Sequence, residues 1–296
     1  MAIIYSNAIG KAKGSMGTIT YNYRGGKTIG KDRVRMTTNP KTFNQMRRRV
    51  QLANIVNMWQ SFLGNLHPSF EDRTPLVSDF NLFVRANLGM VPVYLTDKES
   101  AQGACVVAPY EVSFGSIPSI SVSANGPSGE VGTDISLGSL TVSDSTTLKQ
   151  FSDAIVENNP HFRFGDQITA FVAYQLVNTV TGVPYVDMKA FEVTLDHEAT
   201  ETLIADLDPE LLVFRNLGAT DKLGMNSTVN GGVVYIHSRM DADGKTLVSS
   251  QRLVVANTLL ARYQAGSQLS NAVISYGGNL SPAYLTPNVD EAPAVA

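Results

Sequence analysis

The chain has 296 residues, of which 43% are hydrophobic and 17% charged, with a formal net charge of −3, a composition ordinary for a globular protein with an ample core. Its single cysteine, Cys105, excludes an internal disulfide and any cysteine-pair metal site. The chain begins with no basic segment leading into an apolar run, and no apolar stretch approaches the roughly 18 residues of a membrane span, so we expect neither a signal peptide nor a transmembrane helix.

Charge is divided unevenly along the chain. Residues 1–50 hold eleven Lys and Arg against one acid, Asp32, a net charge of +10 that leaves −13 on residues 51–296. We expect a basic segment of this kind to meet negative charge outside its own surface, either nucleic-acid phosphate or the acidic body of a neighbouring copy. A solvated basic face that contacts nothing is the alternative.

Residues 1–38 predict a basic, glycine-rich arm. Ile19, Tyr21 and Tyr23 alternate ahead of a glycine turn, and residues 28–36 return, which is the pattern of a β-hairpin. A two-stranded unit is only marginally stable alone. We therefore expect the hairpin to dock on the following helix or on another subunit.

Residues 39–66 predict the strongest helix of the chain. Asn39 fits the N-cap with Pro40 at the first helical position, and Thr42 with Gln45 has the spacing of a capping box. Apolar residues recur at three- and four-residue steps and form one face that must be covered. These residues are Phe43, Met46, Val50, Leu52, Ala53, Ile55, Val56, Trp59, Phe62 and Leu63.

A second, shorter helix is predicted after the N-cap Ser78 and ends at Gly89, and residues 96–102 add one helical turn. Two amphipathic helices joined by a short linker favour an antiparallel pair. The helical region of residues 39–103 is thus expected to be a helical hairpin.

From Ala104 the apolar pattern changes to a period of two. Strands are predicted at 104–114, 118–124, 134–143, 167–177, 184–195, 233–240 and 247–256, with a helix at 145–158. About seven strands separated by turns predict an antiparallel immunoglobulin-like β-sandwich over residues 104–256, so the fold class is α+β. Residues 257–296 predict a helical segment, broken near Gly266, and a loose tail.

The sequence contains no convincing catalytic or metal-binding group. The four histidines, at positions 67, 161, 197 and 237, form no metal-ligand pair, and the glycine spacings fit neither a dinucleotide loop nor a P-loop. Asp241-Ala242-Asp243-Gly244 lacks the later ligands of a calcium loop and predicts a hairpin turn. Cys105 lies in an apolar run and is expected to be a buried strand residue. We expect no enzyme activity, no cofactor and no small-molecule substrate.

Five stretches of the chain resemble a domain-of-unknown-function family of Bacteroidetes and their phages, including crAss-like phages. They are the arm GKAKGSMGTITYNYRGGKT, the NPKT start of the long helix with Gln45, Arg48 and Arg49, the segment SDFNLF with Asn87, the segment from Tyr110 to Ser116, and the late hairpin VVYIHSRMDADGKTLVSSQRL. The resemblance covers most of residues 8–116 and 160–256. Residues 145–158, 196–230 and those after 256 depart from the family pattern.

The resemblance implies a structural component of a virion or prophage, and it brings no catalytic residues. The leading hypothesis is a virion protein of a tailed phage, assembled in the host cytoplasm into a multimeric ring or collar at the portal–tail connector or in the tail region. Its partners would be further copies of the chain, the portal, and neighbouring ring or tail proteins, with no membrane partner. The expected subunit-interface residues are Ile19, Tyr21, Tyr23, Trp59 and Phe62.

Two other function classes stay open. One is a nucleic-acid-binding structural protein, and the other is a surface or glycan-binding adhesin module, which only the predicted sandwich suggests. Ten basic residues are expected to contact DNA phosphate or an acidic partner. They are Lys11, Lys13, Arg24, Lys27, Lys31, Arg33, Arg35, Arg47, Arg48 and Arg49.

Overall fold

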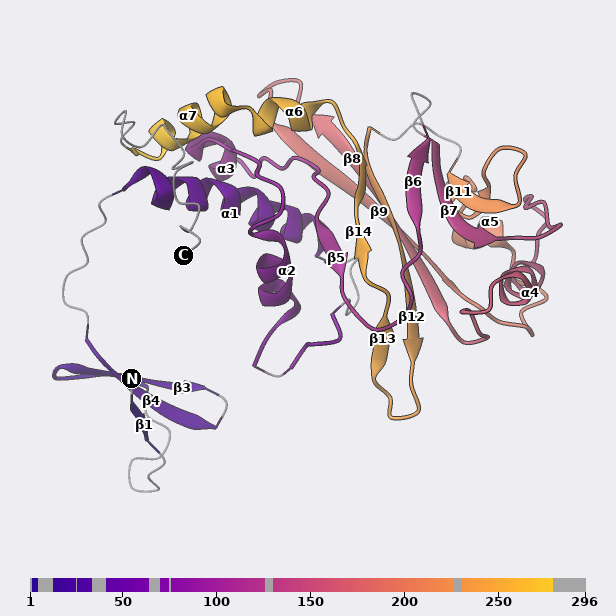
Figure 1. The fold of residues 1–296 in the computed structure, drawn as a ribbon, viewed down its shortest axis with the longest axis horizontal. Coiled ribbons are helices and arrows are strands. Elements are labelled where there is room, and N and C mark those ends of the chain that lie inside the picture. The colour runs from indigo at the N-terminus through magenta and orange to yellow at the C-terminus, as the bar shows by residue number, and fades with distance from the viewer. Residues whose placement is uncertain are drawn as a thin grey trace, which may run out of the picture.

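The computed structural model describes residues 2–4, 13–24, 26–33, 41–63, 70–74, 76–125, 130–225 and 230–278. Their fold is mixed α+β, with an N-terminal antiparallel sheet, a layer of helices and further antiparallel sheets (Figure 1). The described strands close into no barrel.

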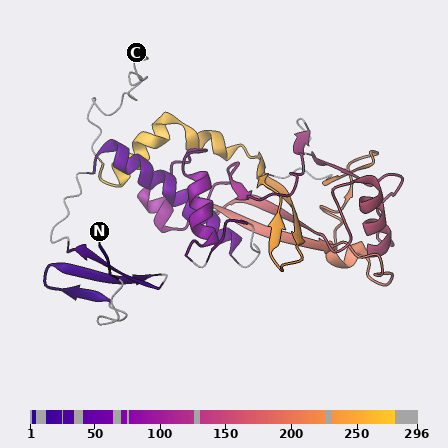
Figure 2. The same ribbon diagram turned by 60° about the horizontal axis from the view of Figure 1, so that its bottom comes forward.

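The N-terminal sheet has the strand order β1-β4-β3-β2. Strands β3 (Ile19–Arg24) and β4 (Lys27–Asp32) form the predicted hairpin, with a register that runs from Ile19 opposite Asp32 to Arg24 opposite Lys27. The short strands β1 (Ala2–Ile4) and β2 (Gly14–Met16) form the two edges of the sheet, where β1 pairs with β4 and β2 pairs with β3. Figures 1 and 2 show this sheet apart from the described residues after position 40, which we call the body. None of the hydrophobic clusters found among the described residues includes a residue of the sheet.

Helix α1 (Phe43–Phe62) begins after Thr42, whose backbone N–H donates to the Gln45 side chain at 3.3 Å. The alternative start at Asn39 and Pro40 lies outside the described residues. The predicted apolar face is wrong in part, because Leu52 and Leu63 are 37% and 62% exposed. Polar residues take the buried positions instead, namely Gln51 and Asn54.

Helix α2 (Asp79–Asn87) begins at the predicted N-cap Ser78, and the short helix α3 (Asp97–Ala101) begins at Thr96. Helix α2 packs on the C-terminal half of α1 through Trp59, whose ring lies 5.9 Å from Phe80 and 5.3 Å from Phe83. Side-chain oxygens of Ser78 and Thr96 accept hydrogen bonds from the first turn of their helices, which explains why both starts were predictable.

The central sheet has the order β13-β12-β8-β9, with β15 (Val254–Ala256) also paired to β12. Its long strands are β8 (Gln167–Val177), β9 (Pro184–Thr194) and β12 (Gly231–Met240), and β13 (Thr246–Val248) lies at the edge. Strands β8 and β12 are buried on both faces. On one face, residues such as Val172 and Val233 pack toward a second sheet; on the other, Phe171 and Val234 pack toward α1 and α2.

The second sheet has the order β10-β11-β7-β6, and its strands are β6 (Val122–Asn125), β7 (Glu130–Ser136), β10 (Arg215–Asn216) and β11 (Lys222–Met225). Helix α4 (Leu148–Asn158) and the short α5 (Ile204–Leu207) pack beside it. The body therefore has a helical layer, the central sheet and the second sheet in succession (Figure 1). The predicted immunoglobulin-like sandwich is not confirmed, because the central sheet is covered on both sides rather than on one.

Four predicted strands differ from the observed ones. The strand predicted at 118–124 begins only at Val122, as β6. The strand predicted at 134–143 ends at Ser136, and the one predicted at 247–256 is broken into β13, β14 (Gln251–Arg252) and β15. Of the strand predicted at 104–114, only β5 (Glu111–Ser113) forms, paired with β14.

Residues 104–110 are buried between α1 and the central sheet but pair with no strand. Side-chain amides satisfy several of their backbone groups, and isolated backbone hydrogen bonds, such as the one from the Cys105 N–H to the Pro184 carbonyl at 2.9 Å, satisfy others. Asn54 donates to the carbonyl of Val106 and accepts its N–H at 3.0 and 2.9 Å, and Gln175 accepts the N–H of Val107 at 2.8 Å. This explains why an apolar run typical of a strand is not one here, since its hydrogen-bond partners come from elsewhere in the chain.

The C-terminal helices α6 (Leu259–Gln264) and α7 (Gly266–Ser275) confirm the predicted break near Gly266. Helix α7 packs on the N-terminal half of α1, where Val273 contacts Phe43 and Met46 and Ala272 contacts Val50. The body thus closes its own core by bringing the last described helix back onto the first.

Candidate interaction surface

One face of the N-terminal sheet carries apolar and aromatic side chains, which are exposed at Met16 and Ile19 and half-buried at Tyr21 and Tyr23. Side chains of residues paired across antiparallel strands point to the same side, so Met16 shares a face with its partner Ile19, and Tyr21 and Tyr23 follow on the same side of β3. Met16 is 72% exposed and Ile19 38% exposed. Thr28, opposite Tyr23, is only 4% exposed. We call Met16, Ile19, Tyr21 and Tyr23 the arm face.

Tyr21 has a special position on the arm face. Its neighbour on β2 is Gly14 and its neighbour on β4 is Gly30. Because glycine has no side chain, neither of the residues directly opposite Tyr21 can cover its ring. Tyr21 is nevertheless half-buried, and Met16 is the most exposed side chain of this face.

The other face of the sheet is basic. Lys27 and Lys31 alternate on β4 and are exposed there, and Lys13 and Arg33 are also exposed at the ends of the strands. Of the predicted phosphate or acidic-partner contacts in this region, Lys11, Arg35 and the side chain of Arg24 lie outside the described residues. The sheet is thus amphipathic, with aromatic residues on one side and lysines on the other.

Trp59 and Phe62 do not join the arm face. Phe62 is 1% exposed and packs edge-on against Phe83 and Phe171, with ring centroids 5.9 and 6.4 Å away, and Trp59 is half-buried against α2. Both side chains pack within their own chain, because α1 turns this part of its face toward the central sheet. We leave Phe62 out of the subunit contact proposed below.

Two of the three consecutive arginines of α1 line a polar hollow of about 550 Å³, and Arg49 is exposed outside it. The Arg48 guanidinium donates to the Gln51 side chain at 3.2 Å and to the Leu88 carbonyl at 3.4 Å. The hollow is lined by Asn44, Arg47, Arg48, Gln51, Gly89, Met90 and Pro92. Two guanidinium groups and no carboxylate in the lining make this hollow a site that attracts anions.

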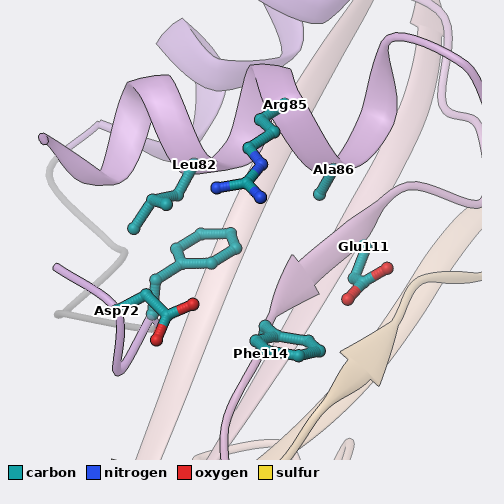
Figure 3. A pocket seen from close by; sticks show the side chains of 7 residues that line it. Asp72, Leu82, Arg85, Ala86, Glu111 and Phe114 are labelled. Atoms are coloured by element: carbon teal, nitrogen blue, oxygen red, sulfur yellow. The ribbon is translucent and has the colours of Figure 1, made fainter.

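A second hollow lies between α2 and the end of β5, and we call it the Phe114 hollow. Its volume is about 320 Å³, and its lining is Phe70, Asp72, Leu82, Arg85, Ala86, Glu111 and Phe114. Figure 3 shows Leu82, Arg85 and Ala86 descending from the helix, while Glu111 and Phe114 rise from the strand and Asp72 closes one side. Phe114 is 50% exposed.

The Phe114 hollow was not predicted from the sequence. Its residues come from a loop, a helix and a strand, and the parallel bridge between Phe70 and Phe114 is what brings the loop to the strand. Glu71 holds this arrangement, since its carboxylate accepts the N–H groups of Ser116 and Val248, both hydrogen bonds lowering its pKa against the raising effect of burial. No residue spacing in the sequence predicts that the loop at Phe70 lies against the segment at Phe114.

The buried polar cluster of the body is structural. Asp166 is 1% exposed, and its carboxylate accepts hydrogen bonds from His237 at 2.8 Å and from Arg239 at 2.6 Å, so β12 is tied to the start of β8. Burial raises the pKa of Asp166, but the hydrogen bonds from Arg239 and His237 outweigh it and lower the pKa to about 2. Phe162 stacks on the His237 ring at 4.3 Å. No local signal could predict this cluster, because Asp166 lies about 70 positions from both His237 and Arg239.

The other groups considered from the sequence are dispersed. His197 contacts Asp153 at 2.5 Å and Lys149 at 3.0 Å on the exposed side of α4, and His67 lies outside the described residues. Asp241 accepts the backbone N–H groups of Asp243 and Lys245, which confirms the hairpin turn. Within the described ranges, no three His, Cys, Asp or Glu side chains lie close enough to share a metal ion.

Cys105 is buried, as expected, but it lies in an extended segment and not in a strand. Its sulfur is 3.6 Å from the Met58 sulfur, and burial raises the pKa of the thiol to about 12. A thiol with so high a pKa stays protonated at neutral pH and is a poor nucleophile.

In the part of the chain that the structure describes, no helix is long and apolar enough to cross a membrane. Comparison with protein-family models, with curated proteins and with solved structures gives no match. The assignment of a function therefore rests on the geometry described above and on the sequence resemblance.

Proposed function

We propose that the chain is a structural subunit that assembles into a ring or collar of a tailed-phage particle, at the portal–tail connector or in the tail region. The observation that carries the assembly is the N-terminal sheet, whose arm face is exposed at Met16 and Ile19 and shares no hydrophobic cluster with the body. The sequence resemblance supports the placement in a virion. In this proposal the two packed sheets of the body are an immunoglobulin-like module that spaces the subunits.

Apolar burial carries the association in this proposal. Burying apolar surface contributes about 25 cal/mol per Å², whereas a contact between exposed charges contributes only about 0–1 kcal/mol. Tyrosine is among the residues that dominate protein interfaces, and Tyr21 and Tyr23 are the aromatic residues of the arm face. The charges of residues 1–50 and of the body then orient the subunits and speed their encounter.

The double variant Tyr21→Ser/Tyr23→Ser tests the proposal. Mass photometry of the full chain should show a multimer that the double variant loses. The matched control is Tyr185→Ser, because Tyr185 is a 43% exposed tyrosine of β9 outside the arm face. A double variant that assembles like the unchanged protein would contradict the proposed role of the sheet.

The virion part of the proposal has a separate test. The genes that flank the one encoding this chain should encode portal, capsid or terminase proteins. Flanking genes for unrelated metabolic enzymes would contradict the placement in a phage particle. They would not contradict the proposed assembly into a multimer.

The arginine hollow on α1 favours a second candidate, a nucleic-acid-binding structural protein. Arg47 and Arg48 line that hollow, and exposed Lys27 and Lys31 lie on the sheet that precedes the helix. DNA affinity measured at two salt concentrations should then fall steeply with salt, and Arg47→Gln/Arg48→Gln should reduce both the affinity and its salt dependence. An absence of DNA binding at low salt removes this candidate.

A further inference from the structure

We infer that strand β9 of one copy pairs with strand β9 of a second copy, so that two antiparallel edge strands join two central sheets across a two-fold axis. Strand β9 ends the strand order β13-β12-β8-β9, and its only strand partner among the described residues is β8. The inference goes beyond the proposed function, because the contact lies on the body and uses no residue of the arm face. Such a contact closes on two copies, so the ring still depends on the arm face.

The hydrogen-bond pattern shows which backbone groups of β9 point away from β8. On an edge strand, residues that bond to the neighbouring strand alternate with residues whose N–H and carbonyl groups point the other way. The N–H of Asn178 donates to the Val183 carbonyl at 2.9 Å, and the N–H of Leu195 donates to the Asp166 carbonyl at 2.8 Å. The register between these two ends is continuous. Odd-numbered residues of β9 therefore bond to β8, and even-numbered residues point toward the open edge.

The open edge lies between Val186 and Ala190. The even-numbered residues there are Val186, Met188 and Ala190, and within the described residues their backbone N–H and carbonyl groups have no hydrogen-bond partner. At the start of the strand the Cys105 N–H already donates to the Pro184 carbonyl at 2.9 Å, and proline has no N–H. An edge strand with unpaired backbone groups is a template for another strand, and this template spans residues 186–190.

The backbone of residues 186–190 fits a second copy of itself. A two-fold axis at Met188 places Met188 opposite Met188 of the second copy, and it places Val186 of each copy opposite Ala190 of the other. All of these residues point toward the open edge, so each opposite pair can exchange N–H to carbonyl hydrogen bonds in both directions. The pairing thus gives a partner to every outward N–H and carbonyl group of the three residues.

The charged side chains agree with this register. Asp187 and Lys189 are exposed, and with the axis at Met188 each Asp187 lies opposite Lys189 of the other copy. These are non-hydrogen-bonded positions, where the side chains of an antiparallel pair are closest. An axis at residue 187 or 189 would instead place two aspartates or two lysines opposite each other, which is destabilising. Charge therefore selects the register centred on Met188.

The contact leaves the core of each copy as it is. Val186 and Met188 pack against the hydrophobic cluster that includes α1 on one face of the sheet, and Phe191 packs against the cluster of the second sheet on the other. A strand that pairs along the edge covers backbone groups and leaves these two faces in place. Charges on an edge strand commonly prevent pairing, but here their opposite signs make two copies attract.

Charge reversal tests the inference in the full chain. The background variant is Tyr21→Ser/Tyr23→Ser, which removes the proposed arm contact. Sedimentation velocity should show it as a dimer. Adding Asp187→Lys alone, or Lys189→Asp alone, should raise the dissociation constant of the dimer by about tenfold, because two attractive pairs become repulsive. An equal mixture of the two variants, and a chain that carries both reversals, should recover the dimer. The control is Asp243→Lys, at an exposed turn position.

The outcomes separate the inference from the proposed function. A background variant that forms no dimer, or a mixture as weak as either reversal alone, would overturn the inference and leave the arm contact standing. If the Tyr21→Ser/Tyr23→Ser change leaves the multimer intact while the reversals act as expected, the proposed role of the arm fails and the inference stands.

Disulfide trapping tests the register. Opposite residues at non-hydrogen-bonded positions have Cα atoms about 4.5 Å apart, within the range of a disulfide, whereas positions diagonal to each other are about 7–8 Å apart. Copies with Asp187→Cys mixed with copies with Lys189→Cys should form a covalent dimer on mild oxidation, and neither variant should do so alone. The only native cysteine, Cys105, is 2% exposed and does not compete. Equal yields from the mixture and from either variant alone would contradict the register centred on Met188.

Discussion

The central sheet and the N-terminal sheet differ in apolar pattern and in surroundings, because β8 is a nearly continuous apolar run whereas Ile19, Tyr21 and Tyr23 of β3 alternate with polar residues. In β8, seven of the eleven residues are buried, and both faces of the strand are covered by other parts of the same chain. In the N-terminal sheet, Met16 and Ile19 of the arm face are exposed, and no hydrophobic cluster of the described residues includes a residue of that face. A continuous apolar run therefore predicts a strand that is covered on both faces, whereas an alternating pattern predicts one covered face without saying which molecule covers it.

The largest expected effect concerns the polar cluster that closes the central sheet. Asp166→Ala leaves His237 and Arg239 without their buried partner, and breaking a buried ion pair costs about 3–5 kcal/mol. Urea unfolding should show a loss of this size. Asp187→Ala, at an exposed position of β9, is the control and should change stability by less than about 0.5 kcal/mol.

The next effect concerns the amide that supports residues 104–110. Gln175→Ala leaves the N–H of Val107 and the carbonyls of Cys105 and Tyr185 without this partner. Each unsatisfied buried group costs about 1–3 kcal/mol, so we expect a total loss of about 2–4 kcal/mol in urea unfolding. Gln60→Ala, at an exposed position of α1, should have little effect, and equal losses from both variants would contradict the role given to Gln175.

A smaller effect should appear at low pH. The pKa of Asp166 is lowered from 3.8 to about 2 in the folded protein, so its carboxylate stabilises the fold above pH 3.8, and this contribution is lost as the pH falls from about 4 to about 2. The shift corresponds to about 2 kcal/mol. The unfolding free energy of the unchanged protein should fall over this range by about that much more than that of Asp166→Asn, because other carboxylates titrate in both. Parallel pH profiles of the unfolding free energy in the two proteins would contradict the stabilising role given to the Asp166 carboxylate.

The smallest effect on stability is expected from the N-terminal sheet. At concentrations where the protein is monomeric, Tyr21→Ser/Tyr23→Ser should change the unfolding free energy of the body by less than about 0.5 kcal/mol, because the arm face shares no cluster with it. Thermal unfolding followed by circular dichroism measures this. A loss above about 1 kcal/mol would mean that the N-terminal sheet packs on the body of its own chain. It would contradict the difference drawn here between the two sheets.

Local signals explain what the sequence could predict. The hairpins of β3 with β4 and of β8 with β9, and the helices after Ser78 and Thr96, follow from alternation, turns and caps within a few residues. What could not be predicted depends on distant partners. Asn54 and Gln175 keep residues 104–110 out of any strand, and a loop and a strand that meet at Phe70 and Phe114 form the hollow. The alternation of Ile19, Tyr21 and Tyr23 was predicted because it is a local pattern within one strand.

Hydroxyl-radical footprinting at low and high protein concentration tests the central claim most directly. Met16 and Met240 form a matched pair, since they are 72% and 71% exposed, and Met16 belongs to the arm face whereas Met240 does not. If the N-terminal sheet is covered by a neighbouring copy, the oxidation of Met16 and the hydroxylation of Tyr21 should fall as the protein assembles, while Met240 stays unchanged. Equal labelling of Met16 and Tyr21 in the monomer and the multimer would contradict the account.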